Sequence, residues 1–310
     1  MRVLFYGTPA FALPTLDALL ERHQVITVIT QPDRPAHRGQ RLTAPPVKER
    51  ALAAGIPVLQ PPRLRDPGWD VRLAALGADV AIVVAFGQIL SKSVLAVPRR
   101  GSINVHASIL PRYRGAAPIA WAIMRGETET GITTFQMEPG MDTGDVLLEA
   151  RTPIAADETA GELAERLSVL GATVAVDTLA RLDTLVPRPQ GHDEATLAPR
   201  LKKADGFVDW GRPAPDIVNV VRGCNPWPGA VTRTPRGPLL TIWRARVAEA
   251  TSAPDAAGAL VTCGDTLAIA SGSGTAVLPL NVQAENRRAQ SWESFLRGAR
   301  LAPGALFTTP

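Results

Sequence analysis

The chain has 310 residues, 45% of them hydrophobic, so it is long and apolar enough for about two domains, each with a buried core. This composition excludes an intrinsically disordered chain, and no segment approaches the roughly 18 apolar residues that a membrane-spanning helix needs. The two cysteines, Cys224 and Cys263, form no CxxC pair, which excludes a disulfide scaffold and a cysteine-based zinc site.

The formal net charge of +4 is distributed unevenly along the chain. Basic and acidic residues balance over residues 1–187, so the whole basic excess lies in residues 188–310. A neutral first part and a basic second part favour a catalytic domain joined to a domain that binds a polyanion, because Lys and Arg neutralise phosphates and release counterions. A solvated basic surface that binds nothing explains the charge equally well.

The first part of the chain alternates between strand and helix patterns. Short β-branched runs at 2–6, 25–29, 79–84 and 101–105 are separated by helical patterns such as 13–21 and 46–54. A strand pair at 131–137 and 145–150 and a long amphipathic helix over 158–182 follow. This alternation predicts a Rossmann-like, mostly parallel sheet in an α/β domain. Because a strand begins at Arg2, we expect no targeting peptide ahead of the fold and a cytoplasmic protein.

The pattern changes after a stretch rich in proline and charge. Residues 186–200 show no periodicity and predict an interdomain linker. Beyond it, a helical pattern covers 213–222, and short strand patterns with Gly and Pro turns cover 229–233, 239–249, 258–262, 265–270 and 274–283. These patterns predict a small, OB-like β-barrel. We therefore expect a catalytic domain at 1–185, a linker at 186–205 and a C-terminal barrel at 206–310.

The first turn between strand and helix reads YGTPAFALP, with Gly7 as its single glycine. A dinucleotide-binding turn needs three spaced glycines, for the tight turn, the approach of the pyrophosphate and the packing of the helix. The sequence therefore disfavours a nicotinamide-dependent enzyme on this sheet.

Asn104 and His106 lie two residues apart at the end of the strand GSINVH. Side chains on one face of a strand recur every second residue, so both project together at the carboxyl edge of the sheet, where ligands bind. A lone histidine at a strand end is more often structural. The paired asparagine favours catalysis, because an amide donor beside an imidazole can hold a carbonyl oxygen as it becomes negative.

Two carboxylates follow in the turn PGMDTGD, Asp142 and Asp145. Either could be carried to the imidazole by this Gly-flanked turn, and Asp142 is the preferred candidate. Aspartate is also common in such turns for local backbone reasons. A metal site made of the two acids and His106 stays open as a weaker alternative.

Two longer segments carry a family resemblance. INVHASILPRYRGAAPI at 103–119 and GETETGITTFQMEPGMDTGDVLL at 126–148 closely resemble the signature of the 10-formyltetrahydrofolate-dependent formyltransferases. The chain start FYGTPAFALPTLDALL, the segment 30–61, FVDWGRP at 207–213 and NPWPGA at 225–230 resemble the branch of this family that formylates methionyl-tRNA. The resemblance extends over both expected domains.

The resemblance implies a role for each matching residue. It implies a catalytic trio of Asn104, His106 and Asp142. It implies a folate-contacting loop formed by Ser108, Ile109, Leu110 and Pro111, and one wall of a pterin pocket formed by Phe86, Gly87, Gln88, Ile89 and Leu90. Phe86 stands where the family is expected to have tyrosine, which removes a hydroxyl and keeps the ring.

The resemblance also implies two contacts with tRNA. A loop inserted after the second strand, residues 31–48, is expected to meet the acceptor end through Arg34, Arg38, Arg41 and Lys48. The barrel is expected to bind backbone phosphates through Lys202 and Lys203 near its start and Arg287 and Arg288 near its end. We expect no metal, no membrane contact and a monomer.

The implied function is transfer of the formyl group of 10-formyltetrahydrofolate to the α-amino group of methionine on initiator methionyl-tRNA. A second hypothesis keeps the donor and takes an amino sugar of a nucleotide as acceptor; the basic loop 31–48 disfavours it, because a sugar site has no use for such a loop. A third hypothesis, a catalytically silent folate- or RNA-binding protein, is disfavoured by the intact trio.

Overall fold

The computed structural model describes residues 1–36, 41–191, 193–248 and 256–310 of the chain. Contacts divide it into two compact units. The N-terminal unit comprises residues 1–118, 129–153 and 164–199, and the C-terminal unit comprises residues 119–128, 154–163 and 200–310. Each unit contains a hydrophobic core of its own.

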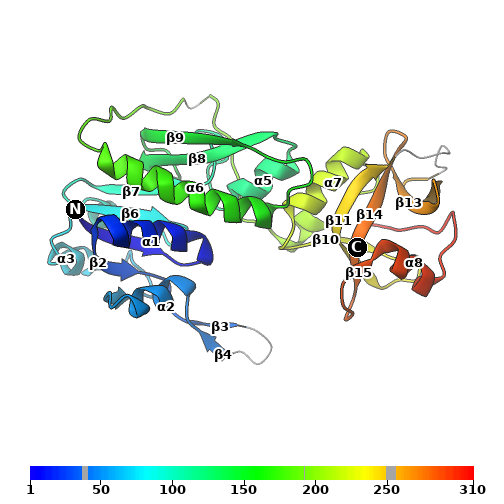
Figure 1. Cartoon of the computed structure of the whole chain (residues 1–310), viewed down its shortest axis with the longest axis horizontal. Coiled ribbons are helices and arrows are strands. Elements are labelled where there is room, and N and C mark those ends of the chain that lie inside the picture. Colours follow the sequence, from blue (N-terminus) through cyan, green and yellow to red (C-terminus); the bar gives the residue numbers. More distant parts are fainter. Residues whose placement is uncertain (37–40, 192, 249–255) are drawn as a thin grey trace. The chain divides into compact units, whose positions relative to one another are not determined.

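The N-terminal unit is built on a sheet whose strands follow the order β5–β2–β1–β6–β7–β8–β9 (Figure 1). The strand bounds are β1 (Arg2–Gly7), β2 (Gln24–Ile29), β5 (Val58–Leu59), β6 (Val80–Val84), β7 (Ser102–His106), β8 (Glu129–Gln136) and β9 (Val146–Pro153). Neighbours from β5 to β7 pair in parallel, whereas β8 pairs antiparallel with both β7 and β9. The expected mostly parallel, Rossmann-like α/β sheet is confirmed.

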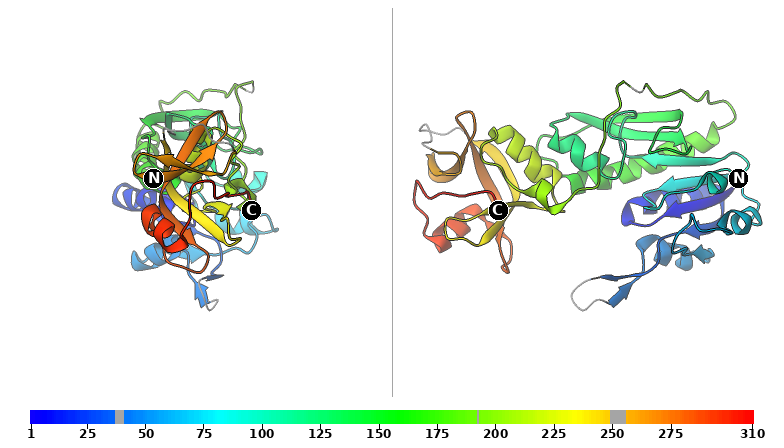
Figure 2. Two further views of the ribbon diagram at one scale, coloured as in Figure 1. Left: turned by 90° about the vertical axis from the view of Figure 1, so that its right-hand side faces the viewer. Right: turned by 180° about the vertical axis from the view of Figure 1, so that it is seen from behind.

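Helices cover both faces of this sheet (Figures 1 and 2). One face carries α1 (Leu13–Arg22) and α6 (Ala160–Ala180), and the other carries α3 (Trp69–Ala74) and α4 (Lys92–Leu95). A Cβ placed on Gly171 of α6 would lie 3.2 Å from Val105 of β7, so the helix packs closely on that strand. On the opposite face, Leu4 and Tyr6 of β1 pack with residues of α3 and α4.

Shorter elements lie beside the sheet and were not predicted. They are η1 (Ala10–Ala12) and the hairpin of β3 (Arg34–Ala36) and β4 (Arg41–Thr43). The helix α5 (Pro118–Met124) follows in sequence after the loop 107–117, and nearly all of it belongs to the C-terminal unit. The helix α2 (Pro46–Ala53), in contrast, matches the expected helical pattern at 46–54. The two strands of the hairpin are each three residues long, which is too short for alternation to identify.

The stretch after α6 runs along the N-terminal unit as far as Pro199. Its backbone pairs with the unit at both ends: Arg188 N–H donates to Val146 O at 2.8 Å, and Ala198 N–H donates to Arg114 O at 2.7 Å. This segment, which is rich in proline and charge, is therefore irregular in structure but hydrogen-bonded to the N-terminal unit. A segment of this kind has no periodic sequence pattern, and neither has a free linker.

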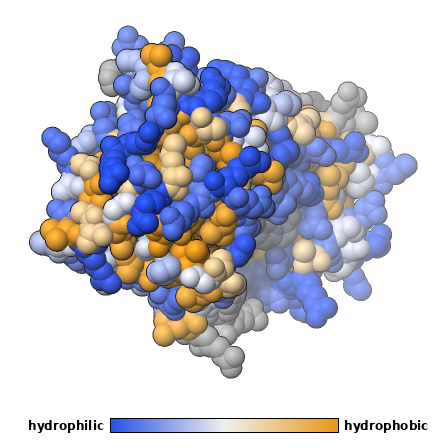
Figure 3. Space-filling view, turned by 60° about the vertical axis from the view of Figure 1, so that its left-hand side comes forward, coloured by the Kyte–Doolittle hydropathy of each residue, from blue (hydrophilic) through white to orange (hydrophobic). Residues whose placement is uncertain are grey.

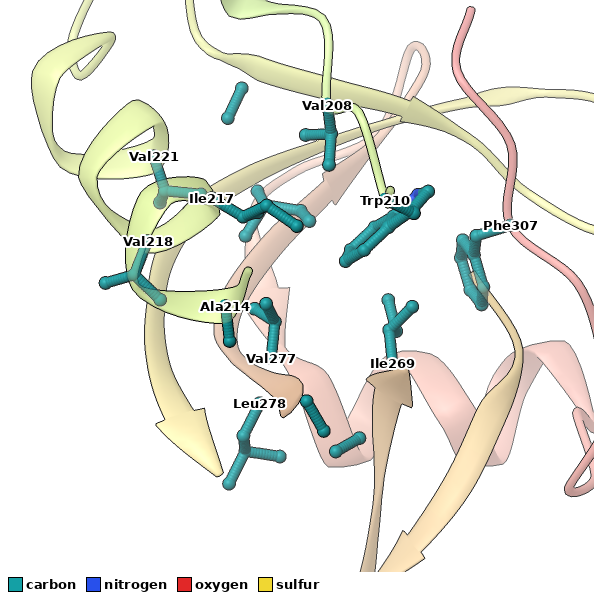
Figure 4. Packing of buried hydrophobic residues seen from close by; sticks show 14 of the residues in the cluster. Val208, Trp210, Ala214, Ile217, Val218, Val221, Ile269, Val277, Leu278 and Phe307 are labelled. Atoms are coloured by element: carbon teal, nitrogen blue, oxygen red, sulfur yellow. The ribbon is translucent and has the colours of Figure 1, made fainter. Parts of the chain in front are cut away.

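The C-terminal unit is an antiparallel sheet in the order β10–β11–β14–β13–β12, with β15 paired to β14. Its elements are η2 (Lys203–Gly206), α7 (Ala214–Gly223), β10 (Ala230–Arg233), β11 (Leu239–Ala248), β12 (Leu260–Cys263), β13 (Thr266–Ser271), β14 (Thr275–Ala284), β15 (Gln290–Ser291) and α8 (Trp292–Ala299). Trp210, Ile217 and Ile269 meet in its core (Figure 4). The C-terminal domain that we predicted as a small, OB-like β-barrel is thus an antiparallel β domain.

The last residues of the chain join the two edges of this sheet. Thr308 bridges Arg233 of β10, and Leu306 bridges Ala259 just before β12. Phe307 between them is 1% exposed and faces the core beside Trp210 and Ile269 (Figure 4). The sheet therefore closes through a short segment that has no strand pattern in the sequence.

The surface mixes polar and apolar side chains, as Figure 3 shows for one face of the N-terminal unit. Among the described residues, every helix is too short or too polar to cross a bilayer.

The two cysteines should differ sharply in reactivity. Cys224 is fully buried, its Sγ lies 3.9 Å from Met124 Sδ, and burial raises the pKa of its thiol to about 12. Cys263 is partly exposed. A cysteine reacts only when the reagent can reach it and when its thiol can form the thiolate. We therefore expect Ellman's reagent to titrate one thiol in the native protein and both thiols in guanidinium. A Cys263→Ser variant should show none until it unfolds, and rapid reaction of both native thiols would contradict the buried position.

Candidate active site

The candidate site lies at the carboxyl edge of the parallel strands. Residues 85–90 follow β6 and residues 107–111 follow β7, and these two strands are neighbours in the sheet. Val105 faces α6 on one side of β7, so Asn104 and His106 project from the opposite face. The predicted pairing of these two side chains on one face is therefore present.

His106 is buried, with 7% of its surface exposed, and each ring nitrogen faces an oxygen. Nε2 lies 2.9 Å from the carbonyl oxygen of Tyr113, and Nδ1 lies 3.7 Å from Oδ2 of Asp142. The first contact is a hydrogen bond. The second is longer than one, which leaves room for a ligand atom or a water to share the two groups.

Asp142 is the carboxylate that reaches this histidine. Its side chain is 17% exposed, and Oδ2 accepts a hydrogen bond from the Gly115 backbone N–H at 2.8 Å. Its φ of 55° lies in the left-handed region, which aspartate tolerates better than most residues. The rival carboxylate, Asp145, is exposed at the end of the same turn. The structure thus places Asp142 beside the imidazole.

Asn104 is half-buried, with its amide nitrogen 4.0 Å from the sulfur of Met137. A thioether is a weak hydrogen-bond acceptor. The amide therefore keeps donor capacity for a stronger acceptor, such as a formyl oxygen that becomes negative.

The loop 108–111 is held from within the protein. Thr133 Oγ1 donates to Ser108 O at 2.7 Å and accepts from Leu110 N–H at 3.2 Å, while Ser108 Oγ donates to Arg112 O at 2.7 Å. Ser108 and Leu110 are buried and Ile109 and Pro111 are partly exposed. The hydroxyl of Thr133, which we did not predict, thus fixes the predicted folate loop.

The pocket wall 86–90 presents backbone more than side chains. The Phe86 ring is 2% exposed and packs edge-on against Tyr6, with the ring centroids 5.4 Å apart. Gln88 Oε1 accepts a hydrogen bond from Leu64 N–H, and Gln88 Nε2 donates one to Pro61 O. Leu90 is buried. Ile89, in contrast, is 80% exposed. The residue that has phenylalanine in place of the expected tyrosine therefore has its ring in the core of the protein.

The base of the predicted tRNA loop is tied to this wall. Gln31 Nε2 donates to Phe86 O at 3.0 Å. Lys48 Nζ lies 2.7 Å from Asp33 Oδ2, and hydrogen bonds from Gln60 and Lys48 hold the pKa of Asp33 below its usual range. Lys48 thus braces the base of the hairpin, and its contact with tRNA stays a prediction.

The other predicted tRNA residues vary in what surrounds them. Arg34 is exposed and donates to Gln31 Oε1. Arg38 lies outside the described residues, and Arg41 is described by its backbone, as the first residue of β4.

In the C-terminal unit, Lys202 and Lys203 are exposed at η2. Arg287 and Arg288 are exposed too, and they line a surface hollow together with Gln290 of β15 and Ser294 of α8. An open hollow with two guanidinium groups suits a phosphate, which is the ligand that we predicted for these arginines.

Within the described part of the chain, no three His, Cys, Asp or Glu side chains are close enough to hold a metal ion.

Besides Thr133, two further residues of the site were not predicted from the sequence, Arg114 and Gln190. Both are buried, and Gln190 Oε1 accepts from Arg114 Nη2 at 2.7 Å. Arg114 lies inside the RYRGAAPI motif, which could have drawn attention to it. Gln190 lies in the stretch interpreted as a linker, and nothing in its neighbours distinguishes it.

Comparison with known families accounts for both units. The formyl transferase model matches residues 1–179, and the model of the formyl transferase C-terminal domain matches residues 200–300. The chain therefore belongs to the formyl transferase family.

Full-length relatives narrow the resemblance to one kind of formyl transferase. A methionyl-tRNA formyltransferase of Citrifermentans bemidjiense is 47% identical over 99% of this chain and 96% of the relative. One from Solibacter usitatus is 49% identical over 97% of this chain and 96% of the relative.

Solved structures share the fold at much lower identity. The sugar 3N-formyl transferase WlaRD has a TM-score of 0.67 at 17% identity, and covers 93% of this chain and 99% of its own. An N-formyltransferase from Helicobacter canadensis has a TM-score of 0.68 at 17% identity, with 92% and 100% covered. These likenesses bear on the fold alone.

Variants of the His106–Asp142 pair should lose activity and keep the fold. His106→Ala removes the predicted donor to the oxyanion, so we expect its single-turnover rate to fall by about 10²–10³. Asp142→Asn removes the predicted proton acceptor, so we expect a fall of about 10²–10⁴, the typical contribution of a general base. Circular dichroism and folate titration should match the wild type. Turnover near the wild-type rate in either variant would contradict the assignment.

Proposed function

We propose that this chain transfers the formyl group of 10-formyltetrahydrofolate to the α-amino group of methionine on initiator methionyl-tRNA. The observation that carries the proposal is the His106–Asp142 pair at the sheet edge of a chain that is 46–49% identical, over nearly its whole length, to methionyl-tRNA formyltransferases. This similarity includes the C-terminal unit and the hairpin after β2, which are the regions expected to contact tRNA.

The reaction needs activation mainly at the formyl carbon. The attacking α-amino group has a reference pKa of about 7.7–8.0, so a useful fraction is neutral near pH 7. The Asn104 amide and the His106 ring stabilise the oxyanion that forms when the amine adds to the formyl group. Asp142, 3.7 Å from Nδ1, orients the ring and accepts the ammonium proton directly or through water. Collapse of the adduct then breaks the bond between the formyl carbon and N10 of tetrahydrofolate, and N10 takes up this proton as it leaves.

The formyl donor is assigned to the space beside loop 108–111. A flat heterocycle with amide-like edges suits a slot lined by peptide groups, and the wall 86–90 offers backbone because its side chains, Ile89 apart, face the protein. We propose that peptide groups of 86–90 and 138–142 read the pterin. WlaRD was solved with 5-N-formyl-THF, which supports a folate-type donor. A folate analogue bound elsewhere would contradict this placement.

A choice of acceptors tests the proposal directly. We expect rapid formylation of charged initiator tRNA with labelled 10-formyltetrahydrofolate, and none of a nucleotide-linked amino sugar, because basic residues and the hairpin suit a polyanion. The sugar alternative rests on the fold likeness to sugar formyltransferases, which are 17% identical. Preferential transfer to the sugar nucleotide would overturn the proposal.

The two expected tRNA contacts should fail in different ways. Replacing Arg38 or Arg41 by alanine should lower the transfer rate and weaken discrimination against elongator tRNA, since the hairpin positions the acceptor end. Replacing Arg287 or Arg288 should weaken binding of all tRNAs alike and reduce the salt dependence by about one unit per lost phosphate contact. Transfer rates and affinities over a salt series measure both effects.

Matched surface arginines provide the controls. Arg22 at the end of α1 and Arg236 between β10 and β11 are exposed and lie outside these surfaces. Their alanine variants should bind and react as the wild type does. Hairpin variants that behave like Arg22→Ala would show that the hairpin has no part in tRNA recognition.

A further inference from the structure

The side chain of Gln190 is buried against the turn that carries Asp142. It is 8% exposed, and its Nε2 donates to Asp142 O at 2.9 Å and to Gly144 O at 2.7 Å. A single amide group thus holds two carbonyl oxygens of one turn. Both contacts lie within the N-terminal unit, although Gln190 is distant in sequence from Asp142.

The acceptor end of the same amide holds the other side of the site. Gln190 Oε1 accepts from Arg114 Nε at 3.1 Å and from Arg114 Nη2 at 2.7 Å, and Arg114 is 7% exposed. The two residues beside Arg114 touch the reacting pair: Tyr113 O bonds to His106 Nε2, and Gly115 N–H donates to Asp142 Oδ2. Gln190 therefore connects the backbone around both functional groups.

The Asp142 turn needs such support. With φ of 55°, Asp142 adopts a backbone conformation that few residues other than glycine take up. The turn is also tightly packed, because a Cβ on Gly144 would lie 1.7 Å from Gln136 O. Hydrogen bonds to Asp142 O and Oδ2 select this conformation over the extended ones available to a free aspartate.

We propose that Gln190 is a positioning residue for formyl transfer, which fixes the Asp142 turn and, through Arg114, the loop that holds His106. The inference rests on the proposed function for its rate measurements. Gln190 acts by keeping His106 Nδ1 and Asp142 Oδ2 at their separation of 3.7 Å. A displacement of about 1 Å at reacting groups can cost about 10²-fold in rate.

An isosteric variant separates the donor role of Gln190 from its packing. Gln190→Glu keeps the size and the oxygen that faces Arg114, and replaces the donating NH₂ by an oxygen that faces two carbonyls. We expect kcat to fall about 10- to 100-fold, with KM for folate and for tRNA little changed. The melting temperature should fall by several degrees while the variant stays folded, because two buried carbonyl oxygens lose their donor. Wild-type kcat in this variant would overturn the proposal.

Arg188 in the same stretch supplies the matched control. Its side chain is 65% exposed and pairs with Glu149 at 2.8 Å, without touching Asp142. Arg188→Ala removes the ion pair with Glu149 and leaves the Gln190 amide in place, so the kcat of this variant should equal that of the wild type. A loss as large as that of Gln190→Glu would show that any loosening of the stretch has this effect.

A double-mutant cycle tests whether Gln190 acts through Asp142. In the Asp142→Asn background, Gln190→Glu should cause little further loss, whereas a general structural role predicts that the losses multiply. Formylation of charged tRNA by the wild type reports on the proposed function separately. A crystal structure of Gln190→Glu gives a readout free of activity: we expect a longer His106–Asp142 separation, and an unchanged turn would overturn the proposal.

Discussion

The candidate site depends on one turn, residues 137–145, folding back along β7. The pairing of Ile103 with Gln136 places the start of the turn beside the first half of β7, whereas His106 lies at the other end of that strand. Asp142 nevertheless comes within 3.7 Å of the imidazole. A strand advances about 3.3 Å per residue, so the turn must cover about 10 Å of β7. Every group that holds this turn therefore also sets the distance between the two functional side chains.

Buried hydrogen bonds, more than apolar packing, keep the turn in place. Leaving a buried amide or guanidinium unpaired costs far more than a hydrogen bond to it contributes, so a satisfied polar network favours one arrangement strongly. Arg114 Nε and Nη2 both donate to Gln190 Oε1, and Gln190 Nε2 donates to two carbonyl oxygens of the turn. Thr133 does the same for the folate loop, with one hydroxyl that both donates and accepts. The expected ligands thus meet surfaces that are already ordered.

The basic residues act in two different settings within the chain. Lys48 is paired with Asp33, so its charge holds the base of the hairpin beside the pocket wall. Arg287 and Arg288 are exposed in an open hollow, where their charge remains available to a phosphate. Net charge and sequence position therefore predict a polyanion partner for this chain. Whether a basic side chain is already paired with an acidic one in the folded protein decides whether it can bind this polyanion.

The sequence by itself determined the elements and the chemistry that depend on local pattern. Period-two and helical patterns identify the parallel strands and α6, and the spacing of Asn104 and His106 places both on one face of β7. Tertiary structure decided the contacts between distant segments. Asp142 rather than Asp145 meets the imidazole, Gln190 supports the turn, and Leu306 to Thr308 close the C-terminal sheet. Such contacts leave no periodic signal, because they consist of single hydrogen bonds between irregular stretches whose approach is set by the packing of the whole unit.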